Sequence, residues 1–385
     1  MLYYLSPILE KVWGPFRLFH SHAFLLAIGT LTAAIAVKIL LPKLWKYLPS
    51  DQGKAILGKE GLISQGKPTG AGFFATLISL PIILLFVPLT IPMIGTLVFL
   101  YFAMLFGYLD DRSAVAWGQL KKGLLDTIVC LGVASCIYFS LVHGTGVYES
   151  VAIWMPLSKA AWHVQWYVYI PIATLLLFIS LNSTNCSDGV DGLAGSLSMF
   201  SLFALALLLY VVIGNMPTAQ YLLIPVGGTA ARLAAKWAIL LMIISGGIAG
   251  YLWWNAEPSK VLMGDAGSRF LGLLVGAGVL VTGNPLLLFV FAPVVIANGG
   301  LGLVKIVILR FLKLLKIDTR PTSTLTKEEQ AKQNIIVKAL FSIRFPLHDH
   351  MKRNHSWSNA QVLMRFMIVQ MFLIPILFLL LIKIR

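Results

Sequence analysis

Apolar runs of about 20 residues recur along the whole chain and constrain its fold more than any other feature. An α-helix of this length crosses the hydrocarbon core of a bilayer. Of 385 residues, 58% are hydrophobic and 12% are charged, whereas soluble domains carry roughly a quarter charged residues. The runs therefore predict an all-α polytopic membrane protein, because helices satisfy their own backbone hydrogen bonds in lipid.

We predict one integral membrane domain, residues 1–385, with ten transmembrane helices and no cleavable signal peptide. The predicted spans are residues 23–42, 71–89, 93–109, 123–142, 168–183, 193–214, 234–254, 269–282, 284–304 and 358–383. No internal repeat is visible, which argues against transporter folds built from inverted repeats.

The cations indicate the topology. Most of the 30 lysines and arginines fall in or beside the loops that follow odd-numbered spans. The positive-inside rule then places these loops in the cytoplasm and both termini outside. The net charge of +15 is attributed to loops facing anionic membrane lipid and a phosphate-bearing substrate, and no nucleic-acid partner is expected.

The second cytoplasmic loop begins with two adjacent carboxylates, Asp110 and Asp111, followed by Lys121 and Lys122. Acidic residues at a bilayer boundary suggest a functional site, although solvated loop residues are the alternative. Carboxylates here could hold Mg²⁺, which typically binds one or two carboxylates plus substrate phosphates, or act as a base toward a lipid phosphate. The lysines could balance diphosphate charge or anchor the loop.

Two further cytoplasmic loops are rich in glycine. The first, residues 66–72, contains Lys67 and Thr69; its backbone could approach a phosphate or sugar, or simply turn into a helix. The third, residues 182–195, has no cation but contains Asp188 and Asp191. Because these are three residues apart, a helical start would place both on one face, with backbone amides directed at an anion.

The fourth and fifth loops add further polar groups. Asp265 lies between glycines, in a turn expected to let its carboxylate project freely as a metal ligand. Residues 305–357 form the longest cytoplasmic loop, whose middle, residues 318–337, is expected to be a surface helix or a mobile excursion. The loop ends with His348-Asp349-His350, which lacks a third ligand at zinc spacing, so phosphate or sugar contacts are favoured.

Five carboxylates and a histidine pair thus face one compartment. Together with Mg²⁺ and cations, they are the parts that phosphoryl transfer needs, since that chemistry is largely positioning and charge stabilisation. Their place at the membrane edge suggests a lipid phosphate as one substrate. A secondary transporter is the alternative from another class, but its acids should lie in the middle of spans.

Four motifs occurring together resemble the polyprenyl-phosphate N-acetylhexosamine-1-phosphate transferases, and most closely their muramoyl branch. They are Gly-Tyr-Leu-Asp-Asp, Asp-Gly-Val-Asp-Gly-Leu-Ala, Trp-Asn-Ala…Met-Gly-Asp-Ala-Gly-Ser and Pro-Leu-His-x-His. The resemblance implies a Mg²⁺-dependent enzyme of the bacterial inner (cytoplasmic) membrane. It would transfer phospho-MurNAc-pentapeptide from UDP-MurNAc-pentapeptide to undecaprenyl phosphate, giving lipid I and UMP. The alternative is a sibling enzyme that transfers GlcNAc-1-phosphate from UDP-GlcNAc, and a homodimer stays open.

The resemblance also implies roles. Asp265 would be the principal metal ligand near Asp110 and Asp111, with Asp110 as the base and Asp111 supporting the metal or the lysines. Lys121 would be the functional lysine, although Lys122 stays an alternative. His348 and His350 would face the sugar-phosphate. The uridine and diphosphate would contact Lys67, Thr69, Asn185, Asp188, Gly189, Val190, Asp191, Asn255 and Leu262.

Two departures from the family pattern stand out. Asp349 separates His348 from His350 where the family usually has three consecutive histidines, and it adds a negative charge there. Leu262 stands where a phenylalanine commonly contacts uracil. Neither departure removes a carboxylate of the predicted site.

Overall fold

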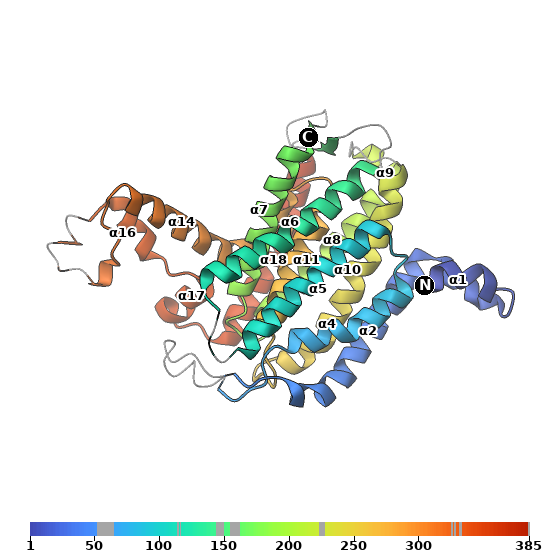
Figure 1. Cartoon of the computed structure of the whole chain (residues 1–385), viewed down its shortest axis with the longest axis horizontal. Coiled ribbons are helices and arrows are strands. Elements are labelled where there is room, and N and C mark those ends of the chain that lie inside the picture. Colours follow the sequence, from blue (N-terminus) through green and yellow to red (C-terminus); the bar gives the residue numbers. More distant parts are fainter. Residues whose placement is uncertain are drawn as a thin grey trace.

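Long apolar helices dominate the computed structural model of the chain (Figure 1). The structure describes residues 1–51, 65–113, 115, 117–143, 150–154, 162–222, 228–324, 326, 329–330 and 333–383. Within these residues, nine helices are long and apolar enough to cross a membrane, and one shorter apolar helix of 16 residues accompanies them. Each of these ten segments overlaps one of the ten predicted spans, although the ninth is displaced along the chain, and the chain is a multi-pass membrane protein.

The first half of the chain forms six of these segments. Its elements are α1 (Leu2–Leu9), η1 (Gly14–His20), α2 (His22–Leu44), η2 (Trp45–Tyr47), α4 (Ala71–Phe86), α5 (Ile91–Arg112), α6 (Gln119–His143), β1 (Ser150–Ile153), β2 (Trp162–Gln165), α7 (Trp166–Cys186), α8 (Leu193–Leu207) and the π-helical η4 (Leu208–Ile213).

The second half contains the remaining four segments and the arm that leaves the bundle. Its elements are α9 (Met216–Tyr221), α10 (Gly228–Asn255), α11 (Gly264–Val281), α12 (Leu287–Phe291), α13 (Pro293–Val295), the π-helical η5 (Ile296–Gly300), α14 (Leu301–Leu314), η6 (Thr322–Thr324), α16 (Ile335–Ser342), α17 (Leu347–His355) and α18 (Asn359–Lys383).

Helix α11 is the centre of the bundle. Every residue from Ala266 to Val281 is buried, and the helix packs against α4, α5, α7 and α8. The outer helices keep apolar side chains exposed, as on α5 and α18, because lipid solvates such side chains as well as a protein interior does. A polar group at the start of α11 is therefore enclosed by helices from several directions.

The ninth span differs from the prediction. Residues 284–304 were expected to form one helix, but α12 ends at Phe291 and a new helix begins at Pro293. Proline has no N–H to donate and suits the first position of a helix, so the break falls before it. The second helix continues through η5 and α14 to Leu314, so residues 305–314 are helical rather than the start of a loop.

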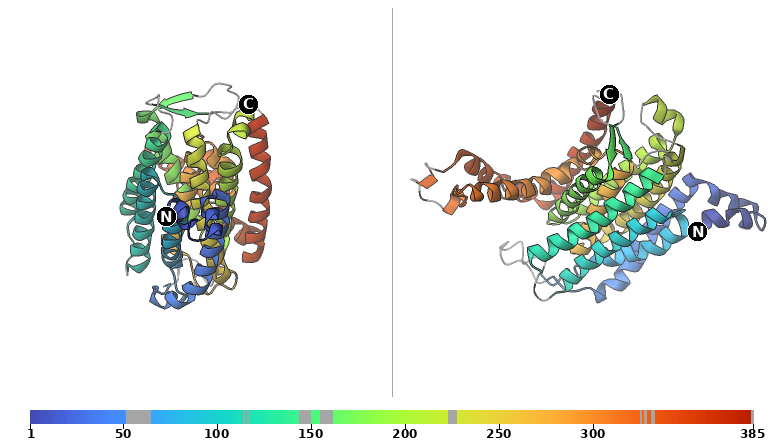
Figure 2. Two further views of the ribbon diagram at one scale, coloured as in Figure 1. Left: turned by 90° about the vertical axis from the view of Figure 1, so that its right-hand side faces the viewer. Right: turned by 45° about the horizontal axis from the view of Figure 1, so that its top comes forward.

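The chain leaves the bundle along α14 (Figure 1). In Figures 1 and 2, α14 and α16 extend sideways, and α17 brings the chain back to the helix ends. Within the expected excursion at residues 318–337, the described part contains η6 and the start of α16, which Asn334 caps by accepting a hydrogen bond from the Ile336 N–H (2.8 Å). Lys327, Glu328 and Lys332 lie outside the described residues.

A β-hairpin is the second departure from the predicted all-helical fold. Strands β1 and β2 pair antiparallel, with Ser150 opposite Gln165 and Ile153 opposite Trp162. The hairpin lies near the end of α18, at the opposite end of the bundle from α17 (Figure 2). Only four residues on each side are involved, too few for their short apolar alternation to outweigh the helical pattern around them.

Candidate active site

Helix ends from distant parts of the sequence converge at one end of the bundle. Helix α5 ends at Arg112, directly after the two predicted carboxylates, and α11 begins at Gly264. Gly107 allows these helices to approach closely, because a Cβ there would lie 2.5 Å from the Asp265 carbonyl oxygen. The two predicted acidic motifs are therefore in contact.

Asp110, Asp111, Lys122 and Asp265 form what we call the carboxylate cluster. The Lys122 ammonium forms an ion pair with Asp110 Oδ2 and lies 3.5 Å from Asp265 Oδ2. Asp110 Oδ1 accepts a hydrogen bond from the Trp117 backbone N–H (2.8 Å), and Asp110 is buried. One cation thus joins two carboxylates that lie far apart in the sequence.

Asp111 secures the start of α11. Its Oδ1 accepts from the Asp265 N–H (3.1 Å) and its Oδ2 from the Ala266 N–H (3.2 Å). Carboxylates favour helix N-termini, where backbone amides are unpaired. Gly264, at φ +73°, makes the turn before the helix, and a Cβ on it would lie 2.5 Å from Asp111 Oδ2. These contacts show that Asp111 caps the N-terminus of α11, which is a structural role. Its metal-binding role stays a prediction.

The sequence suggested that Asp265 lies in a turn where its carboxylate projects freely, and the structure contradicts this. Asp265 lies in the first turn of α11, and its carboxylate is held from several sides. Oδ1 accepts from the Asn185 side-chain amide (3.0 Å), while Oδ2 faces Lys122 and Arg269, whose Nη2 is 3.3 Å away. Its side chain keeps 28% exposure, so it stays reachable from outside.

Lys122, rather than Lys121, reaches the carboxylates. The Lys121 ammonium lies 3.4 Å from the centre of the Trp117 ring, in a cation–π contact, and its side chain is exposed. Consecutive residues on a helix point about 100° apart, so the rotation of α6 allows only one of the pair to face α11. The structure therefore favours the alternative that the sequence left open.

We expect Lys122→Met to lower kcat about 10²-fold, the scale of removing one preorganised charge from an active site. Lys121→Met should stay within a few-fold of wild type, because its ammonium faces an indole ring. Initial rates of the two purified variants, compared at equal folded fraction, test this. A larger loss in Lys121→Met would contradict the assignment.

The third loop joins the carboxylate cluster to the histidine motif. Asn185, near the end of α7, donates to Asp265 Oδ1 and to Ser268 Oγ (3.2 Å). Helix α8 begins only at Leu193, after Gly192, so Asp188 and Asp191 lie in the preceding turn. The expectation that they share one helical face is wrong, because the turn directs the chain away before the helix starts. Val190 is buried beneath this turn, and Asp188 is half-buried.

Asn255, the last residue of α10, joins the third loop to the fourth. Its side-chain oxygen accepts from the Gly192 N–H and its amide donates to the Val261 carbonyl (both 2.8 Å), with the residue buried. Asp191 Oδ2 accepts from the Ser259 N–H (3.1 Å). These contacts brace the loop, whereas substrate contact by Asn255 and Asp191 stays a prediction.

The first loop adds Lys67 to this framework. Its ammonium donates to Ser259 Oγ (3.1 Å). The backbone of Leu262 pairs with the loop, since its N–H donates to the Pro68 carbonyl (2.8 Å) and its carbonyl accepts from the Ala71 N–H (3.0 Å). The Thr69 N–H donates to the Pro49 carbonyl (2.9 Å). The predicted substrate-binding residues of loops one, three and four therefore form one connected structure.

His348 is buried against the third loop. Its backbone N–H donates to Asn298 Oδ1 (2.8 Å), and its ring Nδ1 lies 3.2 Å from the same oxygen. The Asn298 amide donates to Ser187 Oγ (2.9 Å). The His348 ring also lies against Gly189, where a Cβ would be 2.6 Å from Nε2. His348 and the third loop are thus in contact through Asn298, which the sequence analysis missed, whereas contact of His348 with the sugar-phosphate stays a prediction.

His350 and Asp349 lie around this contact. His350 Nδ1 accepts weakly from the Arg344 N–H (3.4 Å), and its ring contacts that of His355. Asp349 Oδ1 lies 3.6 Å from His348 Nε2. Asp349, the middle residue of the motif, therefore places its negative charge beside the buried His348. The His350 ring instead contacts another residue of the same helix, His355.

Burial lowers the pKa of His348 from 6.5 to about 4, with Asp349 opposing the shift. Between pH 6.5 and 4 the unfolded chain then binds a proton that the folded chain does not, so the free energy of unfolding falls as pH falls through this window. Below about pH 4 this contribution levels off. Melting temperatures of wild type and His348→Gln in detergent check this, because the variant lacks the titrating group and should show a flatter profile.

The carboxylate cluster suits Mg²⁺ by the chemistry of its donors. Within the described stretches of the chain, no three His, Cys, Asp or Glu side chains are arranged as ligands of one metal ion. Mg²⁺ needs fewer, since it is usually held by one or two carboxylates, water and substrate phosphates. Asp265 and Asp110 are two such hard oxygen donors, joined through Lys122.

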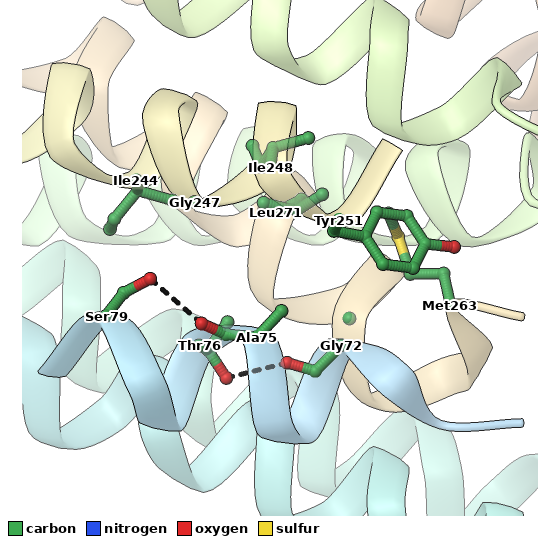
Figure 3. A pocket seen from close by; sticks show the side chains of 11 residues that line it. Gly72, Ala75, Thr76, Ser79, Ile244, Gly247, Ile248, Tyr251, Met263 and Leu271 are labelled. Carbon is green, nitrogen blue, oxygen red and sulfur yellow. Dashed lines mark hydrogen bonds between the residues drawn. The ribbon is translucent and has the colours of Figure 1, made fainter. Parts of the chain in front are cut away.

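A separate, small apolar pocket lies between α4, α10 and α11 (Figure 3). The hydroxyls of Thr76 and Ser79 bond to carbonyls of their own helix, Gly72 and Ala75 (both 2.8 Å). The wall they form is therefore apolar. Of the described side chains, no carboxylate lines this pocket, so it is distinct from the site built on the carboxylate cluster.

Comparison with known proteins agrees with this geometry. Residues 93–283, which include all members of the cluster, match the family model described as glycosyl transferase family 4. The phospho-N-acetylmuramoyl-pentapeptide-transferase of Treponema pallidum is 38% identical over 368 residues, covering 94% of this chain and 91% of that protein. Proteins of the same name from Brachyspira hyodysenteriae and Borrelia hermsii are 28% and 27% identical, over 96% and 92% of this chain and 96% and 94% of theirs. The chain belongs to the phospho-N-acetylmuramoyl-pentapeptide-transferase family.

Proposed function

We propose that this protein transfers phospho-MurNAc-pentapeptide from UDP-MurNAc-pentapeptide to undecaprenyl phosphate, giving lipid I and UMP. The observation that carries the proposal is the meeting of Asp110, Lys122 and Asp265 at one end of a membrane bundle. Family membership supplies the substrates, since the curated relatives bear the name of this activity. Negative charge at the bilayer edge next to a cation suits a reaction between two phosphates.

In this reaction a lipid phosphate oxygen attacks the β-phosphorus of the donor, and the bond to the α-phosphate oxygen breaks as UMP leaves with the electron pair. Asp110 takes the proton of the lipid phosphate, and Lys122 balances negative charge between Asp110 and Asp265. Bound Mg²⁺ would be held chiefly by Asp265, with Asp110 nearby, and would neutralise charge on the diphosphate. The His348 side of the site would contact the sugar-phosphate.

The distribution of lysines and arginines supports one orientation of the protein in the membrane. The cluster lies at the end of the bundle where α2 ends, α6 begins and the arm departs, and the lysines and arginines gather on these segments. The Met1 ammonium bonds to the Leu84 and Leu85 carbonyls (both 3.0 Å), at the far end of α4 from the site. The positive-inside rule thus supports a cytoplasmic active site and outside termini, and family membership supports insertion in the bacterial inner membrane. A homodimer stays a prediction.

Release of UMP by purified protein in detergent, with undecaprenyl phosphate and Mg²⁺, tests the proposal. UDP-MurNAc-pentapeptide and UDP-GlcNAc are supplied in parallel reactions. We expect release only with the muramoyl donor. Release only with UDP-GlcNAc would keep the chemistry but assign the protein to the sibling activity, and no release with either from folded protein would refute the proposal.

A further inference from the structure

Two buried charges behind Asp265 have no part in the reaction described so far. Arg269 follows Asp265 by one turn of α11, and Asp126 follows Lys122 by one turn of α6. Arg269 Nη1 forms an ion pair with Asp126 Oδ1, and its Nη2 is 3.3 Å from Asp265 Oδ2. Three helices, α5, α6 and α11, thus contribute to a row of alternating charges: Asp110, Lys122, Asp265, Arg269, Asp126.

Burial shows that the inner pair is more than a surface contact. Asp126 is 2% exposed and Arg269 is 5% exposed, at a depth where the neighbouring side chains on α11 are apolar. Charges in such places are expensive and generally mark function, and a buried ion pair adds little stability compared with apolar residues of similar volume. Stability alone therefore gives a weak reason for placing this pair behind Asp265.

The planar guanidinium explains why arginine suits this position. Its separate nitrogens donate in a fixed fork, so a group held by Asp126 through Nη1 presents Nη2 to Asp265 in a fixed direction. Asp126 also neutralises Arg269. Without it, the guanidinium charge would fall on Asp265 alone and compete with any cation that this carboxylate binds.

We infer that Arg269 and Asp126 are positioning residues for Asp265. Arg269 orients the carboxylate, and Asp126 neutralises Arg269, which leaves the negative charge of Asp265 available to a divalent cation. The inference rests on the proposed function, because it deepens the role given there to Asp265. It adds two residues, Asp126 and Arg269, to those that set the geometry of the reaction.

The test uses the full chain in detergent with two readouts, UMP release and the melting temperature as a function of Mg²⁺ concentration. Asp126→Leu/Arg269→Met removes both charges at similar volume and should keep the wild-type melting temperature in EDTA. Its kcat should fall about 10–100-fold, the range for groups that orient metal ligands. Asp126→Asn leaves Arg269 paired with Asp265 alone and should raise the Mg²⁺ concentration for half-maximal stabilisation about tenfold, again the scale of such groups.

Two further variants separate the positioning role from a loss of folding and from a general effect of removing charge. Arg269→Lys retains a buried cation beside Asp126, and so should fold, but one ammonium cannot reproduce the fork and kcat should still fall about tenfold or more. The exposed pair Asp318–Arg320 provides the matched control, since Asp318→Leu/Arg320→Met removes the same charges far from the cluster and should change neither readout.

The outcomes separate the two claims. Wild-type protein that is neither stabilised by Mg²⁺ nor able to release UMP would refute the proposed function and this inference with it. The positioning role alone would be refuted by two results together. The wild-type protein would be stabilised by Mg²⁺ and release UMP, and a folded double variant or Arg269→Lys variant would show the wild-type kcat and Mg²⁺ dependence. A loss of kcat explained entirely by a lower folded fraction would also overturn it.

Discussion

Asp265→Asn is expected to lower turnover at least about 10³-fold while the protein stays folded. The loss corresponds to the several kcal/mol that a bound metal supplies to charge stabilisation in the transition state. Folding should survive because the asparagine oxygen can still accept from Asn185, and because Asp111 continues to hold the backbone of α11. Initial rates over a range of Mg²⁺ concentrations measure the effect.

The control for this prediction is Asp318→Asn, which also removes one carboxylate. Asp318 is half-exposed and pairs with Arg320 on the arm, so its replacement should leave kcat and the Mg²⁺ dependence unchanged. Wild-type activity of Asp265→Asn would remove the metal assignment and, with it, the central position of α11 in the mechanism.

Asp110→Asn is expected to lower kcat by about 10²–10⁴-fold, the usual contribution of a general base. Its KM for the UDP donor should change little, because Asp110 would act on the lipid phosphate. Asparagine can still accept from the Trp117 N–H but loses the charge that pairs with Lys122. Steady-state rates over a range of donor concentrations separate kcat from KM.

Lys122→Met serves as the partner variant for Asp110→Asn. If the two residues act as one unit, the double variant should lose little more rate than the worse single variant. A defect of Asp110→Asn confined to donor KM would contradict the role of base and would instead place Asp110 in donor binding.

The sequence predicted the bundle and the convergence of its loops well, for physical reasons. A span must be long and apolar, and cations mark one side of the membrane, so both signals are strong and local. The motifs around Asp110, Asp265 and His348 then had to lie at one end. The contacts of Asp265 with Lys122 and Asn185 confirm that convergence.

Side-chain directions could not be predicted in the same way. Lys121 and Lys122 are adjacent, and only the rotation of α6 against α11 decides which one faces the carboxylates. The turn at Asp188 and Asp191 ends before α8 starts, although their spacing suits a helix. Such details depend on contacts between distant segments, which a single sequence does not display.

The residues that the sequence analysis missed share one property. Asp126, Arg269 and Asn298 lie inside apolar segments, where each is a polar residue among hydrophobic neighbours. An intramembrane polar residue is itself a signal of function, and applying that rule within spans as well as at their ends would have singled them out. Their partners would still have been unknown, because each pairs with a residue at least 50 positions away.

Formation of the lipid-linked product tests the central claim most directly. Purified protein is incubated with UDP-MurNAc-pentapeptide and undecaprenyl phosphate, with Mg²⁺ or with EDTA, and both products are measured by mass spectrometry. We predict equal amounts of UMP and of undecaprenyl-diphospho-MurNAc-pentapeptide with Mg²⁺, and neither product with EDTA. UMP without the lipid product would show hydrolysis rather than transfer, and product formation in EDTA would contradict the role given to the carboxylate cluster.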